Sequence, residues 1–222
     1  MLRPILFAIS ISVLSPLTQA HINSHTKEDT SIQGIVIAEE SAARQLKQKL
    51  QLLNTFNAGF SQTVIDAQGE LVQESTGELT LKQPNLMIWQ VNAPDENLLV
   101  ADGETLWYSD PFVEQVTAVL QSQSVANNPV VLLTDPSNQS WQDFKVSYHD
   151  DHFIVAAKMP ESQIAQLKLY FDQANQLIKL SFVDRQQQVS ELIFSDIRQN
   201  LPIGSEQFVF VIPDGYELDD QR

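Results

Sequence analysis

Residues 71–109 read LVQESTGELTLKQPNLMIWQVNAPDENLLVADGETLWYS, and this stretch decides the fold. It contains four short segments rich in apolar and β-branched residues, at residues 71–81, 86–91, 97–101 and 105–109. The breaks between them contain Pro84, Pro94 and Gly103, which are residue types typical of turns and hairpins. Short strands joined by tight turns predict a meandering antiparallel sheet.

The same pattern continues in both directions along the chain. Upstream, Phe56, Ala58 and Phe60 alternate with other residues, as expected for one face of a strand over residues 56–64. Downstream, seven more strands are predicted, at residues 114–120, 143–148, 153–157, 163–171, 177–183, 189–197 and 207–212. Residues 216–222 are predicted to be an acidic surface tail.

Two helices are predicted as well, one before the first strand and one between strands. Ala42, Leu46 and Leu50 recur at helical spacing, which predicts an amphipathic helix that begins near residue 39. Asn128 is a good helix cap, and Pro129 after it suits the first helical position. The sequence therefore predicts a second, short helix at this point.

A long antiparallel sheet with only two helices has unpaired edges and a large apolar face that must be covered. Curling the sheet around the helices meets both requirements. We therefore expect a mainly β protein of the α+β class, an incomplete antiparallel β-barrel of about eleven strands. A helical lid should close it, and the barrel should enclose an apolar cavity.

The N-terminal residues have the layout of a secretory signal. Arg3 precedes an apolar run, and Thr18 and Ala20 are small residues suited to a cleavage site near Ala20. We expect a signal peptide, a flexible N-terminal extension and a single domain, at residues 1–20, 21–38 and 39–222. The chain has no cysteine, so the mature protein should reach the periplasm without an acyl anchor of its own.

Charge and motifs narrow the function. The chain has 13 Lys and Arg against 28 Asp and Glu, a formal net charge of −15, which disfavours nucleic acid and anionic lipid surfaces as partners. We find no nucleophile elbow, zinc-protease helix or phosphate-binding glycine loop. His149 and His152 flank two aspartates, and a solvated hairpin turn explains this cluster better than a metal site. We expect no catalytic residues, metal or cofactor, and keep a secreted enzyme as an alternative.

Three runs of sequence resemble the LolA-like outer-membrane lipoprotein carrier proteins: GELTLKQPNLMIW at 77–89, LLVADGETLWY at 98–108 and DPFVEQVT at 110–117. The resemblance begins near Ser41 and continues to the terminal DDQR. It implies a monomeric periplasmic chaperone, without a cofactor, that shields the acyl chains of lipoproteins. It also implies two partners, an inner-membrane ABC-type releasing complex and the outer-membrane receptor LolB. An envelope-stress regulator of the same fold remains a further alternative.

The resemblance suggests residues that bind acyl chains. On the sheet and its turns we expect Phe60, Met87, Trp89, Leu98, Trp107 and Phe112. On the lid helices we expect Leu46, Leu50, Val130, Val131 and Leu133. Where family members carry an arginine thought to control lid closure, this chain has Gln83. A neutral amide can still donate hydrogen bonds to carbonyls, without charge assistance, so Gln83 is the candidate for lid gating.

Overall fold

The computed structural model describes residues 28–124, 129–137, 139–159 and 162–222. The predicted signal peptide, residues 21–27 and Asn128 lie outside these ranges, so the domain limits stay a prediction. The helical elements are α1 (Glu28–Gln51), α2 (Gln121–Ser124), and three 3₁₀ turns, η1 (Pro129–Thr134), η2 (Gln139–Asp143) and η3 (Ser205–Phe208).

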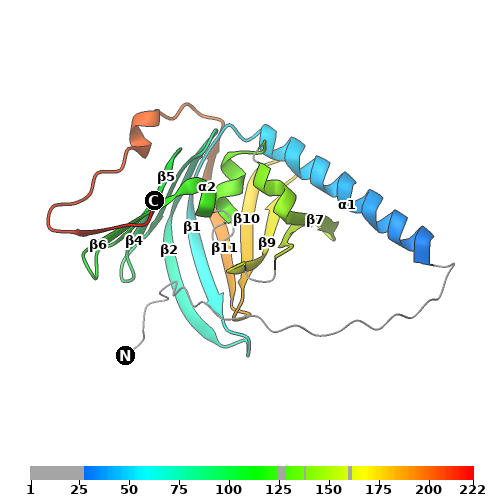
Figure 1. Cartoon of the computed structure of the whole chain (residues 1–222), viewed down its shortest axis with the longest axis horizontal. Helices are drawn as coiled ribbons and strands as arrows, with labels where there is room; N and C mark the ends of the chain where they lie inside the picture. The colour runs from blue at the N-terminus through cyan, green and yellow to red at the C-terminus, as the bar shows by residue number, and fades with distance from the viewer. Residues whose placement is uncertain (1–27, 125–128, 138, 160–161) are drawn as a thin grey trace.

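Twelve strands form one sheet. The strands are β1 (Thr55–Ile65), β2 (Leu71–Lys82), β3 (Leu86–Val91), β4 (Asn97–Asp102), β5 (Thr105–Asp110), β6 (Gln115–Leu120), β7 (Phe144–His149), β8 (His152–Ala157), β9 (Ile164–Phe171), β10 (Leu177–Asp184), β11 (Val189–Gln199) and β12 (Glu217–Asp220). Their order is β12-β6-β5-β4-β3-β2-β1-β11-β10-β9-β8-β7, and only β12 pairs parallel to its neighbour. The sheet bends strongly without closing, and α1 runs past the part that carries β7, β9 and β10 (Figure 1). The predicted incomplete barrel with a helical lid is confirmed.

The core lies between the curved sheet and the helices. The alternation predicted for β1 is confirmed, because Phe56, Ala58 and Phe60 are all buried. They join one apolar cluster that includes Leu46 of α1 and Leu133 of η1. Side chains therefore fill the space that we expected to be a cavity, in the conformation described. An acyl chain could enter it only by displacing them.

The C-terminal segment differs from the prediction. The strand expected at 207–212 is wrong: the backbone forms η3 and then runs without pairing. The predicted acidic tail instead contains β12, which pairs with β6, with Glu217 opposite Gln115. Strand pairing uses backbone groups, so the free edge of β6 accepts a short acidic strand whose side chains project to either side.

The first helix is longer than predicted. It begins at Glu28 instead of near residue 39, so residues 28–38 of the expected extension have helical backbone. No proline lies between Glu28 and Gln51 to stop the helix, and Ile32, Ile35 and Val36 continue the apolar spacing towards the N-terminus. The second predicted helix is present as the 3₁₀ helix η1.

Gly77 of β2 makes room for the aromatic contact between Phe60 and Trp89 on the inner face. It lies directly opposite Phe60 of β1. A β-carbon at Gly77 would overlap both the Phe60 ring and the carbonyl oxygen of Gln90. The glycine therefore allows the Phe60 ring to lie over the strand and reach Trp89, with the ring centroids 5.8 Å apart.

We predict that Gly77→Ala lowers the free energy of unfolding by about 1–3 kcal/mol, because the added methyl group overpacks a site walled partly by backbone. Gly59→Ala on β1 is the matched control. There the new methyl group would lie 3.2 Å from the Ser195 hydroxyl, a side chain that can rotate away. Urea denaturation of both variants measures the difference, and equal losses would contradict this interpretation.

Candidate functional site

Eight of the eleven residues predicted to bind acyl chains lie together on the inner side of the sheet. Seven of them are buried within the main apolar cluster, and Trp89 packs against it: the sheet contributes Phe60, Met87 and Trp89, and the lid contributes Leu46, Leu50, Val130, Val131 and Leu133. The sheet and lid residues therefore contact one another within a single apolar interior. Each of these five lid residues is buried against the sheet.

An aromatic series crosses the inner face. The Trp89 ring meets Phe60 on one side and Phe182 on the other, edge to face, with centroids 5.8 Å and 6.3 Å away. Trp89 and Phe182 are only partly buried, unlike Phe60. These two residues are therefore not fully enclosed by the rest of the interior. Phe182 was not among the predicted residues.

The structure does not bring Leu98, Trp107 and Phe112 to this interior. Leu99 of β4 lies opposite Trp89 of β3 and Tyr108 of β5, so these three side chains project from the inner face. Leu98 and Trp107, each one position away, project from the other face because strand side chains alternate. Leu98 there lines an open hollow of about 390 Å³.

Phe112 lies in the turn between β5 and β6 and is 88% exposed. Turn residues are not held to either face of the sheet by strand pairing, so its apolar side chain is free to project into solvent. It is therefore far more exposed than the other predicted residues, and it is not part of the interior cluster.

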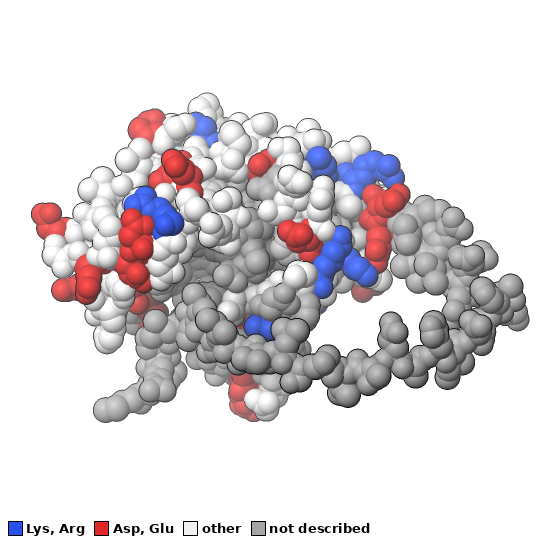
Figure 2. Space-filling view, in the orientation of Figure 1, with Lys and Arg blue, Asp and Glu red and all other residues white. Residues whose placement is uncertain are grey.

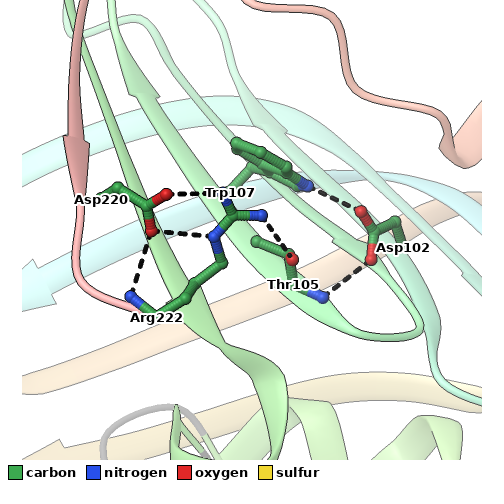
Figure 3. Close-up of polar contacts among 5 residues, drawn as sticks. All are labelled: Asp102, Thr105, Trp107, Asp220 and Arg222. Atoms are coloured by element: carbon green, nitrogen blue, oxygen red, sulfur yellow. Dashed lines mark hydrogen bonds and ion pairs between the residues drawn. The ribbon is translucent and has the colours of Figure 1, made fainter.

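Trp107 is held on the outer face by the C-terminus (Figure 3). Its ring stacks on Phe210, with centroids 5.3 Å apart, and the Arg222 guanidinium lies 5.0 Å from the ring centroid. The indole N–H donates to Asp102 at 2.7 Å. Burial acts to raise the pKa of Asp102, but hydrogen bonds from Trp107 and from the Thr105 and Glu104 amides outweigh it, so this pKa is lowered.

Gln83 contacts both parts of the lid. It lies in the turn between β2 and β3, and its side-chain amide donates to the carbonyl oxygen of Leu50 on α1 at 2.8 Å and to that of Leu133 on η1 at 3.4 Å. The Leu50 carbonyl oxygen also accepts from the Leu53 N–H at 2.9 Å, so Gln83 adds a second hydrogen bond at the end of α1. The hydrogen bonds predicted for Gln83 are present, without the charge that an arginine would bring.

The same turn fastens η1 through its backbone. The Asn85 N–H donates to the carbonyl oxygen of Thr134 at 3.1 Å. The Asn85 carbonyl oxygen in turn accepts from the side chain of Gln121 on α2. Residues 83–85 therefore join the sheet to α1, η1 and α2 at one point.

The segment that follows α1 is tied to the end of the neighbouring strand β11 by Asn200, which comes directly after that strand. Its side-chain amide donates to the carbonyl oxygen of Leu52, and its side-chain oxygen accepts from the Asn54 N–H, both at 2.9 Å. Asn200 has a positive φ of 60°, a conformation that asparagine tolerates better than most residues. It fixes the point from which α1 leaves the sheet, and the sequence analysis did not identify it.

Charge is unevenly distributed over the molecule. Figure 2 shows acidic side chains predominating over the end that carries β5 and β6, while basic side chains gather near α1.

Among the described residues, no three His, Cys, Asp or Glu side chains are grouped as metal ligands would be. His149 and His152 pair across the hairpin of β7 and β8, and the His152 ring stacks on Tyr170. No described helix is long and apolar enough to cross a membrane.

Comparison with known proteins gives one consistent match. The family model described as outer membrane lipoprotein carrier protein LolA matches residues 51–211. The outer-membrane lipoprotein carrier protein of Aeromonas salmonicida (strain A449) is 38% identical over 181 residues, which cover 82% of this chain and 90% of that protein. The protein of the same name from Pasteurella multocida (strain Pm70) is 38% identical over 181 residues, covering 82% and 88%. A crystal structure of a LolA superfamily protein from Nitrosomonas europaea aligns with a TM-score of 0.45 at 14% identity, covering 76% of this chain and 98% of that one.

We predict that Gln83→Met lowers the free energy of unfolding by about 1–2 kcal/mol, because two carbonyls lose a donor while the side-chain volume is kept. Gln83→Arg should restore or strengthen these bonds through charge assistance. Gln48→Met, at an exposed position of α1, is the control and should change stability by less than about 0.5 kcal/mol. Chemical denaturation measures all three, and an unaltered Gln83→Met protein would show that Gln83 does not hold the lid.

Proposed function

The chain belongs to the LolA family of outer-membrane lipoprotein carrier proteins, and we propose that it holds the acyl chains of its cargo on the inner face of its sheet. Membership of this family makes the chain a carrier rather than an enzyme. The observation that supports the location is the composition of the interior: aliphatic and aromatic side chains from the sheet meet aliphatic side chains from a separate lid.

Because side chains already fill the interior, cargo enters by taking the place of the lid side chains on the sheet. Each acyl methylene removed from water is worth about 0.8 kcal/mol, so a bare acyl chain cannot cross an aqueous compartment without a shield. Leu46 and Leu50 of α1 already supply apolar contacts to the sheet. An entering acyl chain replaces these contacts, and the lid moves aside with little net change in buried apolar area.

Only a few polar contacts oppose this movement. The bonds from Gln83 come from a neutral amide, and the bond from Asn85 is between backbone groups. Such bonds contribute about 1 kcal/mol each, so binding of cargo can shift the lid to an open state without ATP. A lid held much more tightly would prevent loading.

The proposed route is the one that the family resemblance implied. The signal-like N-terminus supports export to the periplasm after cleavage near Ala20. We infer that an inner-membrane ABC-type complex supplies acylated lipoproteins, and that the receptor LolB on the outer membrane takes them. Free movement between two membranes suits a monomer that has no acyl anchor of its own.

Release of lipoproteins from spheroplasts tests this function. Mature protein incubated with spheroplasts should bring acylated lipoproteins into the soluble fraction, bound to it at about one per chain. A protein of similar size and charge without an apolar interior serves as the control. Recovery of the carrier without lipoprotein would overturn the proposal.

The two faces of the sheet provide a sharper test of the location. Trp89 and Leu98 are both partly buried, but Trp89 faces the interior and Leu98 the outer hollow. We predict that Trp89→Ala reduces bound lipoprotein about tenfold, the effect of losing one large apolar contact. Leu98→Ala should leave binding unchanged. Thermal melting of both variants separates lost binding from lost folding, and equal binding by the two would argue against the inner face.

A further inference from the structure

The end of α1 has a second polar attachment that lies apart from Gln83. Lys49 is in the last turn of the helix, and its ammonium group donates to the side-chain oxygen of Asn175 at 2.6 Å. The same ammonium lies 5.1 Å from the centroid of the Phe171 ring, as in a cation–π contact. Lys49 is half-buried, whereas Lys47 on the same helix is exposed.

The acceptor at Asn175 is held in place by its own turn. Asn175 lies between β9 and β10 with a φ of 63°, and its N–H donates to the carbonyl oxygen of Asp172 at 3.1 Å. The Asp172 carboxylate also accepts from the Gln176 N–H at 2.8 Å. The Asn175 carbonyl oxygen accepts from the Gln199 side chain. These bonds do not involve α1, so they can hold Asn175 in position when the helix moves.

The two attachments lie on opposite sides of the helix end. Gln83 precedes β3, whereas Asn175 precedes β10, and the sheet order places β2, β1 and β11 between those two strands. The neighbouring residues Lys49 and Leu50 are thus fastened to different parts of the curved sheet. Lifting the end of α1 breaks both attachments.

We propose that Lys49 and Asn175 form a second latch, which sets how often α1 leaves the sheet and so how readily cargo enters. This inference rests on the proposed function. The ammonium donor is charged and the helix C-terminus favours a positive charge, so this bond is stronger than one from a neutral amide. The chain thereby combines a neutral donor at Gln83 with a charged one on the opposite side. Lys49 acts as a positioning residue, because its ammonium contacts Asn175 and the Phe171 ring at the margin of the apolar cluster and none of the residues proposed to hold cargo.

Three variants of the full mature protein test the latch. Lys49→Met keeps the length and apolar stem of the side chain but removes the ammonium, Lys49→Arg keeps a charged donor, and Lys47→Met makes the same charge change at the exposed control position. Hydrogen exchange of the α1 amides around residues 46–50 is measured in the absence of cargo. Lys49→Met should speed exchange about tenfold, and the other two should match the parent.

Combining variants tests whether both attachments oppose one opening. If they do, Gln83→Met with Lys49→Met should speed exchange by the product of the two single effects. If Lys49→Met exchanges no faster than Lys47→Met, or if arginine fails to restore slow exchange, the latch is overturned.

A second measurement separates the latch from the proposed function. Uptake of a fluorescent fatty acid by the parent and the three variants reports on the inner face. Faster exchange with faster uptake in Lys49→Met supports both ideas. Faster exchange in a protein that takes up no fatty acid and releases no lipoprotein would support the latch and overturn the carrier site.

Discussion

The hydrogen bonds made by residues 83–85 are the interaction on which the arrangement of the lid depends. The side chain of Gln83 reaches the carbonyls of Leu50 and Leu133, and the backbone of Asn85 reaches Thr134. One tight turn therefore sets the positions of α1 and η1 over the sheet. The apolar contacts beneath do not define the lid position in the same way, because they are non-directional.

This arrangement divides two tasks between two kinds of interaction. Leu46 and Leu50 supply burial, and in the proposed exchange an acyl chain supplies the same burial in their place. Hydrogen bonds fix the position of the lid on the sheet, and the acyl chains of the cargo cannot form these bonds in its place. The free-energy difference between the closed and loaded states is therefore decided largely by a few polar groups, even though apolar area accounts for most of the stability of each state.

The local sequence predicted most of the strands correctly. It did not predict contacts between residues that are far apart in the chain. Alternation and turn residues were sufficient to locate β1 to β11, but β12 pairs through backbone groups that leave no side-chain pattern. Trp107 was assigned to the site by the family resemblance, while its face depends on register with β4. Lys49 and Asn175 are 126 residues apart, and no local signal connects them. The inner residues Met87 and Trp89 were suggested by the family resemblance, and they share a face because they are two positions apart on one strand.

The two faces of the sheet are covered by different parts of the chain, held in different ways. On the outer face, Phe210 and Arg222 enclose Trp107, and β12 pairs with β6, so a continuous stretch of chain covers this side. On the inner face, the cover is a helix tied mainly near its C-terminal end, by Gln83, by Asn200 just beyond it and by Lys49. A helix attached near one end can move away from the sheet as a unit, whereas a strand paired along its length must break its backbone hydrogen bonds one after another. In the proposed carrier mechanism, opening is therefore directed to the inner face, where the apolar cluster lies.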